Sequence, residues 1–455
     1  MTLLGRLLPL CTLLGVCLTN SSGRAESLRP PRDRPHILVV IADDLGWGDL
    51  ACYGSDRIRT PRLDALAAGG VRWTQFYAAS SICTPTRCSI LTGRYPQRFG
   101  LGQHLPLVTE RGLPDDTVTL PRLLRAAGYR TAHVGKWHLG RENLAELGFD
   151  HALITRYPWA ELGGQDSFLH RDGVDYTFRN GRKVAPSSRF LAEYYADEAI
   201  ALLEEACWRE EPLFLNLWFY APHTPYNLAP EPYRRDYQGE AEDTDLKYRS
   251  MVTCLDASIG RVVDRLEALG MLDNTLILFA SDNGPSEEGS AGPYLGGKSD
   301  LHEGGIRVPM IAHWPARIAP GRVTEAVGHT NDLLATCCAA AGLPLPGDVA
   351  FDGIDLLPHL VEEEPVGERA LFWSLPRQKR YPRPGRRPMP HATQVIRRGR
   401  WKLSAYRSRA LRLIDLQADP GESQSRLRKE TETRKALLAE LRGWLQPLRQ
   451  ASEQK

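Results

Sequence analysis

Four short runs with the character of strands, each followed by ionisable or amide side chains, constrain the fold of this 455-residue chain more than any other feature. They occupy residues 36–41, 130–134, 213–220 and 275–280. The first, third and fourth are largely apolar, as is typical of strands that are buried on both faces of a sheet, whereas residues 130–134 are fewer and less apolar. The segments between them have helical spacing, and the alternation predicts an α/β fold with a large, mostly parallel central sheet flanked by helices.

The segment around Cys83 is predicted to begin a helix. Pro85 fits a first helical turn, and Gly93 fits a helix end, so Cys83 is expected at or just before the N-terminus. Backbone N–H groups at such a terminus favour a bound anion. Other helices are predicted at residues 62–68 and 247–269 from their flanking proline and glycines and their apolar spacing.

Oxygen ligands follow the first and the last of the four runs. Asp43 and Asp44 come after residues 36–41, and Asp282 and Asn283 come after the fourth run. The carboxyl ends of parallel strands meet at one edge of a sheet, where ligands bind. Hard oxygen ligands favour Ca²⁺ or Mg²⁺ over zinc. Taken singly, each pair also fits an ordinary loop cap or turn, and only their combination favours a metal site.

Cationic and titratable groups follow the other runs. Lys136 and His138 come after residues 130–134, and His223 follows the third run. Lys298 lies in a glycine-rich segment, and Arg87 lies four residues after Cys83. Fixed positive charge stabilises the oxygens of an anionic ester, and histidine can move protons near neutral pH. Each of these groups alone also fits a solvated loop.

Together these motifs resemble the type I, formylglycine-dependent sulfatases. The resemblance begins with Cys-Thr-Pro-Thr-Arg at residues 83–87, which continues as Cys-Ser-Ile-Leu-Thr-Gly-Arg. It extends through Gly-Lys-Trp-His-Leu-Gly at 135–140, Asp-Asn-Gly at 282–284 and Glu-Gly-Gly-Ile-Arg-Val-Pro at 303–309. The order of these motifs over most of the chain is similar to the arylsulfatase A and N-acetylgalactosamine-6-sulfatase branch.

The resemblance implies a mechanism and a role for each residue. A formylglycine-generating enzyme would oxidise Cys83 to formylglycine, whose hydrated aldehyde attacks the sulfate ester. By the same resemblance, Arg87 and Lys136 would hold the hydrate, and His138 would take a proton when the aldehyde is regenerated. His223 and Lys298 would grip the sulfate and assist the departing alcohol. The ion, most often Ca²⁺ in this family, would be bound by Asp43, Asp44, Asp282, Asn283 and the modified Cys83.

The resemblance also implies an alkaline-phosphatase-like superfold with a smaller C-terminal unit. We expect an N-terminal catalytic domain over residues 34–345 and an α+β subdomain over residues 346–455. In the second unit, residues 393–403 have the pattern of a hairpin, residues 413–416 that of another strand, and residues 432–448 that of an amphipathic helix. An antiparallel sheet with a packed helix is therefore predicted.

Residues 1–25 have the layout of a secretory signal. Arg6 precedes an apolar stretch from Leu7 to Leu18, which is followed by small residues. The stretch is too short to span a membrane, so no transmembrane segment is expected. A secreted or periplasmic protein is predicted, or a lysosomal one in a eukaryote.

Composition narrows the possible partners and leaves alternatives for function. The formal net charge of +2 does not suggest a nucleic-acid-coating protein, and a hydrophobic content of 42% is ample for a large core. The favoured prediction is an exported sulfatase that acts on sulfated carbohydrate or an aryl sulfate. The alternatives are a phosphoester hydrolase of the same superfold and a catalytically silent glycan-binding relative. The ester and sugar position, exo or endo action, disulfide pairing and oligomeric state stay open.

Overall fold

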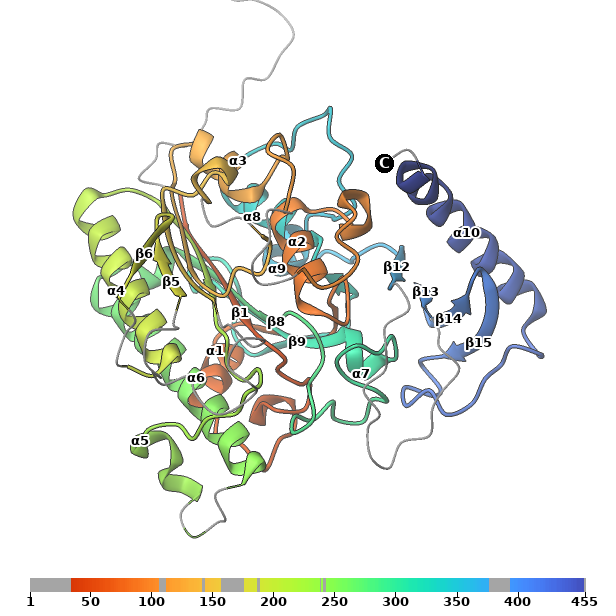
Figure 1. Ribbon diagram of the computed structural model, residues 1–455, viewed down its shortest axis with the longest axis horizontal. Coiled ribbons are helices and arrows are strands. Elements are labelled where there is room, and N and C mark those ends of the chain that lie inside the picture. Colours follow the sequence, from red (N-terminus) through yellow and green to blue (C-terminus); the bar gives the residue numbers. More distant parts are fainter. Residues whose placement is uncertain are drawn as a thin grey trace, which may run out of the picture.

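A large mixed sheet dominates the structure, a computed structural model (Figure 1). The strand order is β10-β2-β9-β8-β1-β7-β3-β4-β5-β6, with β11 paired to β2. The structure describes residues 34–105, 112–140, 144–156, 176–185, 189–237, 239, 243–375 and 393–453. The predicted signal segment 1–25 lies outside these residues. The strands of this sheet are β1 His36–Ala42, β2 Val71–Tyr77, β3 Arg130–Gly135, β4 His151–Arg156, β5 Tyr176–Arg179, β6 Arg182–Val184, β7 Leu213–Trp218, β8 Thr275–Ser281, β9 Arg307–His313, β10 Arg322–Thr324 and β11 Gly328–His329.

The centre of the sheet is parallel, as the sequence predicts. β1 pairs in parallel with β7 on one side and β8 on the other, and β3 continues the parallel order to β4. All four predicted strands are confirmed. Antiparallel strands extend the sheet, because β9 pairs antiparallel with β8 and β2, and β5 pairs antiparallel with β4. The sheet is therefore mixed at its edges.

Helices cover both faces of this sheet and enclose two apolar cores. One core contains side chains of α1, α4 and α6, and the other contains side chains of α2, α3, α8 and α9. Buried apolar contact on both faces explains why β1, β7 and β8 are largely apolar in sequence. The helices are α1 Pro61–Ala68, α2 Cys83–Thr92, α3 Leu120–Ala126, α4 Leu191–Arg209, α5 Glu231–Arg234, α6 Thr244–Ala268, α7 Glu303–Ile306, α8 Asp332–Ala340, α9 Leu357–Glu362 and α10 Thr431–Glu453. Short 3₁₀ turns cover Ala51–Tyr53, Pro96–Phe99, Leu144–Leu147, Arg235–Tyr237 and Leu272–Asn274.

The helix that begins at Cys83 is confirmed with both predicted ends. All ten residues of α2 are buried, and Gly93 closes the helix in the left-handed conformation, with φ of 64°. Its N–H donates to the Ser89 carbonyl over 2.9 Å. A residue with a Cβ pays a steric penalty in this conformation, so the glycine suits the helix end. The buried helix therefore fixes the position of Cys83, its first residue.

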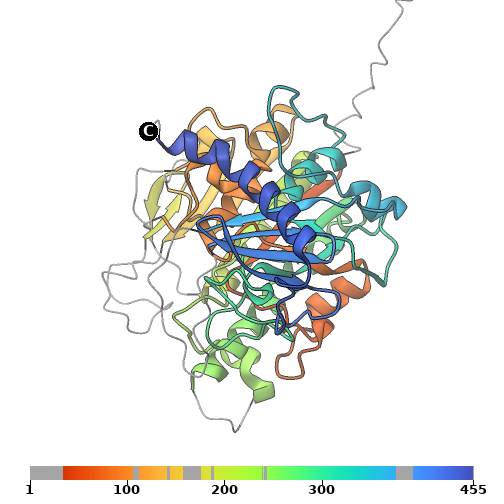
Figure 2. The ribbon, with the colours of Figure 1, turned by 90° about the vertical axis from the view of Figure 1, so that its right-hand side faces the viewer.

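A second, four-stranded antiparallel sheet is formed by β12 Ala370–Ser374, β13 Gln394–Arg398, β14 Trp401–Tyr406 and β15 Arg409–Asp415. Figure 2 shows α10 lying across this sheet, and its leucines share a core with β13, β14 and β15. The predicted hairpin, strand and final helix are thus confirmed. The boundary between residues 345 and 346 stays a prediction; α9, which follows it, packs Leu360 into a core of the large sheet.

A buried ion cluster joins the two sheets. Lys402 of β14 is fully buried and lies 3.0 Å from a carboxylate oxygen of Glu303 and 3.1 Å from one of Glu422. Glu422 also accepts a hydrogen bond from the Glu303 backbone N–H over 2.6 Å. Glu303 begins α7, five residues after Lys298. The C-terminal sheet therefore supports the segment that carries Lys298.

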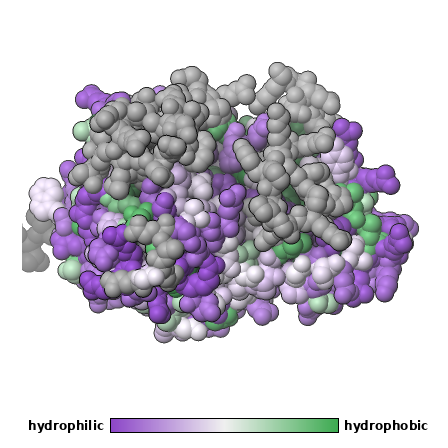
Figure 3. Space-filling view, turned by 60° about the horizontal axis from the view of Figure 1, so that its bottom comes forward, coloured by the Kyte–Doolittle hydropathy of each residue, from purple (hydrophilic) through white to green (hydrophobic). Residues whose placement is uncertain are grey.

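The surface is mostly hydrophilic where Figure 3 colours it, with small apolar areas between. No helix among the described residues is long and apolar enough to cross a membrane. The described cysteines are all free thiols, namely Cys52, Cys83, Cys88, Cys207, Cys254, Cys337 and Cys338.

Candidate functional site

The carboxyl ends of the central strands deliver the carboxylates to one point. Asp43 and Asp44 follow β1, and Asp282 follows β8, its parallel neighbour. All three side chains are fully buried. The Asp44 backbone N–H lies 3.3 Å from Asp282 Oδ1, and Asn283 Nδ2 donates to Asp44 Oδ1 over 2.7 Å. Parallel pairing of β1 and β8 therefore builds the carboxylate cluster directly.

Cys83 lies against this cluster at the first position of α2. Its Sγ is 3.4 Å from Asp43 Oδ1 and 3.5 Å from the Lys136 ammonium nitrogen. Burial, followed by the charge of Asp43, raises the pKa of the Cys83 thiol above its ordinary value. Because of this raised pKa, the thiol is protonated at neutral pH.

Arg87 lies one turn further along α2 and ties three elements together. Its Nε and one terminal nitrogen donate to Asp282 Oδ2 over 3.0 and 2.7 Å, and its other terminal nitrogen donates to the Lys136 carbonyl over 3.0 Å. The guanidinium also lies over the Trp218 ring at 5.3 Å. Because Arg87 is fully buried, these contacts fix its orientation and that of Asp282.

Two lysines contact different carboxylates of the cluster. Lys136 Nζ contacts Asp43 Oδ2, and Lys298 Nζ lies 2.7 Å from Asp44 Oδ2. Burial raises the pKa of both aspartates, but the cations outweigh it. The pKa of Asp43 is well below its usual range, chiefly because of Lys136, and Lys298 has the largest lowering effect on the pKa of Asp44. The formal charges of this site balance, because three carboxylates face three cations. The cations are Lys136, Lys298 and Arg87.

His223 lies beside Lys298 over the same carboxylate. Its Nε2 is 3.7 Å from Asp44 Oδ2, and its Nδ1 contacts the Thr224 carbonyl. An N–H at Nδ1 satisfies that carbonyl and leaves the Nε2 lone pair facing the site. Burial, and then the charge of Lys298, lowers the pKa of His223 to about 4. The imidazole is therefore neutral at pH 7.

His138 is held in a strained backbone conformation. Its φ is 57°, and Asp44 also has a positive φ, of 65°. Such angles are uncommon outside glycine and cluster at functional sites. His138 Nε2 donates to the Leu105 carbonyl over 3.1 Å, while its buried Nδ1 contacts no hydrogen-bonding group in the described structure. A lone pair is thus available at Nδ1.

Two glycines permit this packing. Gly135 has φ of 114°, and a Cβ there would lie 2.0 Å from the Trp218 carbonyl oxygen. A Cβ on Gly284 would lie 1.9 Å from the Gly304 carbonyl oxygen. Gly284 does not have a positive φ, so close backbone contact explains the glycine at this position.

The oxygen ligands fit a hard divalent cation. Asn283 Oδ1 is buried and has no hydrogen-bond donor among the described residues, whereas the Nδ2 of the same amide is satisfied by Asp44 and the Gly284 carbonyl. Burial and the neighbouring charge of Asp43 raise the pKa of Asp282 to about 7. Crowded buried carboxylates and an unpaired amide oxygen are the donor set that Ca²⁺ or Mg²⁺ prefers.

Comparison with known proteins agrees with this geometry. Residues 35–343 match the family model described as Sulfatase. The chain belongs to the sulfatase family. Its enzyme class is that of the sulfuric ester hydrolases, as predicted. Residues 296–451 also match the model described as N-sulphoglucosamine sulphohydrolase, C-terminal.

Similar sulfatases cover most of the chain. An N-acetylgalactosamine-6-sulfatase from Sus scrofa is 36% identical over 367 residues, which are 74% of this chain and 68% of that protein. Human arylsulfatase A is 36% identical over 369 residues, covering 74% of this chain and 70% of that protein. A crystal structure described as Ps i-CgsB in complex with k-i-k-neocarrahexaose is 26% identical with a TM-score of 0.80, and the match covers 90% of this chain and 92% of that chain.

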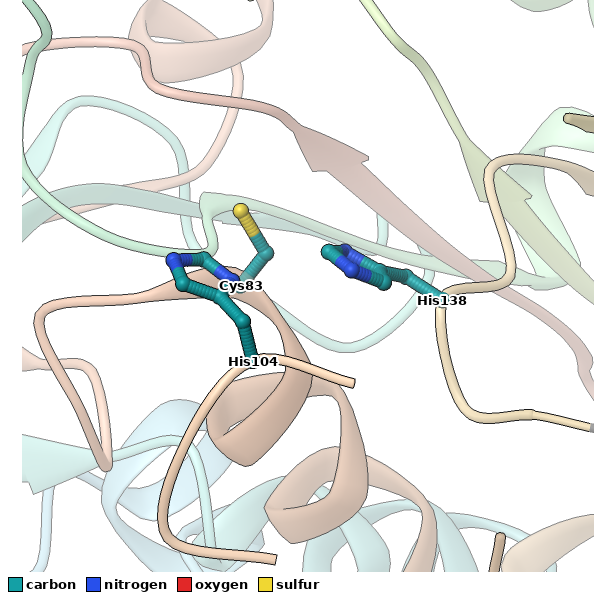
Figure 4. A group of neighbouring side chains, drawn as sticks. All are labelled: Cys83, His104 and His138. Atoms are coloured by element: carbon teal, nitrogen blue, oxygen red, sulfur yellow. The ribbon is translucent and has the colours of Figure 1, made fainter. Parts of the chain in front are cut away.

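All ten sequence-predicted residues of this sulfatase lie in the one site, but their individual roles remain predictions. Sequence reasoning missed His104. Figure 4 shows its ring and that of His138 on either side of the Cys83 side chain. One ligand atom from each of the three residues lies within 4.8 Å of the others. His104 lies in an irregular segment without a motif or periodicity, so no sequence signal pointed to it.

Proposed function

We propose that this enzyme hydrolyses sulfate esters of carbohydrates through a formylglycine derived from Cys83. The observation that carries the proposal is the position of Cys83. It begins a buried helix, with Asp43 3.4 Å and Lys136 3.5 Å from its sulfur. Burial and Asp43 keep the thiol protonated, so the unmodified side chain is a poor nucleophile here. A formylglycine-generating enzyme is the partner that this requires.

The modification supplies a hydrated aldehyde with two hydroxyl groups, one to attack sulfur and one to allow release of sulfate. The surrounding residues position it. Lys136 and Arg87 place positive charge around position 83, and Arg87 is held rigid by Asp282 and the Lys136 carbonyl. His138 presents the buried Nδ1 lone pair and is proposed to accept a proton, although burial and then the charge of Lys136 lower the pKa of its imidazole well below the ordinary value.

We assign a divalent cation, Ca²⁺ or alternatively Mg²⁺, to Asp43, Asp44, Asp282 and Asn283, together with the modified residue 83. When bound, this ion supplies Lewis-acid charge for a sulfate oxygen. The assignment is supported by the unpaired Asn283 Oδ1 and the raised pKa of Asp282.

Lys298 and His223 are proposed to bind the sulfate and assist the leaving alcohol. Burial lowers the pKa of Lys298, but Asp44 outweighs burial and raises it above the ordinary value, so Lys298 stays cationic. An anionic sulfate beside His223 adds negative charge and raises the pKa of the imidazole, which makes proton transfer easier. The two residues share Asp44 as a neighbour, so both face the same part of the site.

A carbohydrate ester is favoured by the similar proteins. An N-acetylgalactosamine-6-sulfatase is 36% identical, and the solved structure with a TM-score of 0.80 is described with a bound neocarrahexaose. Export is proposed from the signal-like residues 1–25 and suits such a substrate.

The experiment is a panel of sulfated mono- and disaccharides, an aryl sulfate, and the matched phosphate esters. The protein is produced with a formylglycine-generating enzyme, and a Cys83→Ala variant is the control. We expect sulfate release from at least one sugar, strong preference over phosphate, and loss of more than about 1,000-fold in the variant. Preference for phosphate would support a phosphoester hydrolase. Tight glycan binding without turnover, even after conversion of Cys83, would support a silent binding protein.

A further inference from the structure

His104 occupies a position at the mouth of the site that the proposed mechanism does not use. Its side chain is exposed, whereas Cys83 is fully buried and Lys136 is 2% exposed. The His104 and His138 rings are stacked, with centroids 5.7 Å apart and an angle of 18° between their planes. Figure 4 shows that both reach the Cys83 side chain from different loops. His104 is therefore an exposed side chain beside the buried residue 83.

The loop that carries His104 is fixed to the site. The backbone N–H of the next residue, Leu105, is 3.3 Å from Thr84 Oγ1, and the Leu105 carbonyl accepts the hydrogen bond from His138. The same Thr84 hydroxyl donates to the His138 carbonyl over 3.0 Å. These contacts link the His104 loop to the start of α2 and to His138, so Thr84 and His138 hold the loop that carries His104 in place.

The chemistry of His104 suits a neutral polar group. A neutral imidazole offers one donor and one acceptor, which matches a hydroxyl group. The cations Lys136, Lys298 and Arg87 already serve the anion deeper in the site. Among the described residues, no side chain forms a hydrogen bond with the His104 ring.

We propose that His104 is a specificity-determining residue that forms a hydrogen bond with a hydroxyl group of the sulfated sugar. The inference rests on the proposed carbohydrate sulfatase function. The sulfur must lie near residue 83, and the rest of the alcohol then extends toward solvent, where His104 stands. A flat aryl sulfate offers no neighbouring hydroxyl, so it gains nothing from this contact.

The test compares His104→Phe with the wild-type, formylglycine-containing enzyme on two substrates. Phenylalanine keeps a planar ring against His138 but has neither nitrogen. On the sulfated sugar that the wild type cleaves best, kcat/KM is expected to fall about 10- to 100-fold, the effect of losing one neutral hydrogen bond and leaving a substrate hydroxyl unpaired. On 4-nitrophenyl sulfate, the change is expected to stay below about 3-fold. His104→Gln, which retains a donor and an acceptor, should recover part of the loss.

Gln103→Ala, at the exposed neighbouring position, is the matched control and should leave both substrates unaffected. Thermal unfolding of each variant reports whether the fold is kept. Equal losses of His104→Phe on both substrates, or no loss on either, would overturn the role of His104 while leaving the proposed function intact. A wild-type enzyme that cleaves aryl sulfates but no sulfated sugar would overturn both.

Discussion

Replacement of Lys402 by methionine is expected to destabilise the protein strongly, because the two sheets meet at a buried charge cluster. Lys402 is fully buried between Glu303 and Glu422, with N–O distances of 3.0 and 3.1 Å. Methionine keeps most of the side-chain volume and removes the charge. Two buried carboxylates then face each other without their common cation.

The expected loss in the free energy of unfolding is about 3–5 kcal/mol, the range for breaking a buried ion pair by removing one partner. Glu303 keeps a 2.5 Å hydrogen bond from the Tyr77 hydroxyl and a 3.4 Å contact with Arg307, so the loss is not larger. The assay is urea unfolding at pH 7, followed by tryptophan fluorescence and by the loss of sulfatase activity.

Lys435→Met is the matched control, because Lys435 also pairs with a glutamate, Glu432 at 2.9 Å, but is 63% exposed. Its loss should be below about 1 kcal/mol. Adding Glu422→Gln to Lys402→Met should recover part of the stability, because one buried charge disappears. The reasoning fails if Lys402→Met costs no more than the Lys435 control, or if the second substitution deepens the loss.

Three further results are expected. The positive charges around Glu303, foremost that of Lys402, outweigh the effect of burial and lower the pKa of Glu303 from 4.5 to about 2. Ionised Glu303 therefore contributes about 3 kcal/mol to the free energy of unfolding above pH 4.5, and this contribution is lost as the pH falls toward 2. Urea midpoints measured from pH 6 to 3 should fall less in Glu303→Gln than in the wild type. Gly135→Ala should lower the free energy of unfolding by more than about 2 kcal/mol, because the added Cβ would lie 2.0 Å from the Trp218 carbonyl oxygen. Gly128→Ala, also at positive φ but with open space around the added Cβ, should lower it by about 1 kcal/mol. Similar melting temperatures for the two variants would contradict this reasoning. Removal of divalent ions by a chelator should abolish turnover. Adding Ca²⁺ or Mg²⁺ should restore turnover in the wild type but only poorly in Asn283→Ala. Full activity of the metal-depleted protein would exclude the assigned ion site.

The central strands and the core of the site could be predicted from the sequence because both depend on local patterns. An apolar, partly β-branched run such as residues 37–41 is typical of a buried strand. Once β1 and β8 are parallel neighbours, Asp43 and Asp282 must meet at their carboxyl ends. The Cys83 motif begins a helix because Pro85 and Gly93 suit its two ends. Local chemistry therefore determined most of the site.

Features that depend on long-range pairing were not predictable. Strand β9 includes the last three residues of the Glu-Gly-Gly-Ile-Arg-Val-Pro motif, for which no strand was predicted from the sequence. It pairs antiparallel with both β8 and β2, and this pairing follows from packing. The Lys402 cluster joins residues that are 99 positions apart along the chain. His104 reaches the site because its loop is tied to Thr84 and His138, contacts that have no periodic signal in the sequence.

The most direct measurement of the central claim is mass spectrometry of the peptide that contains Cys83, made on preparations with graded conversion by a formylglycine-generating enzyme. Formylglycine replaces the thiol by an aldehyde, so the two forms differ in mass. The account predicts that kcat on a sulfate ester rises in proportion to the converted fraction and extrapolates to nearly zero for the pure thiol form. Full turnover by protein that carries only the Cys83 thiol would contradict it.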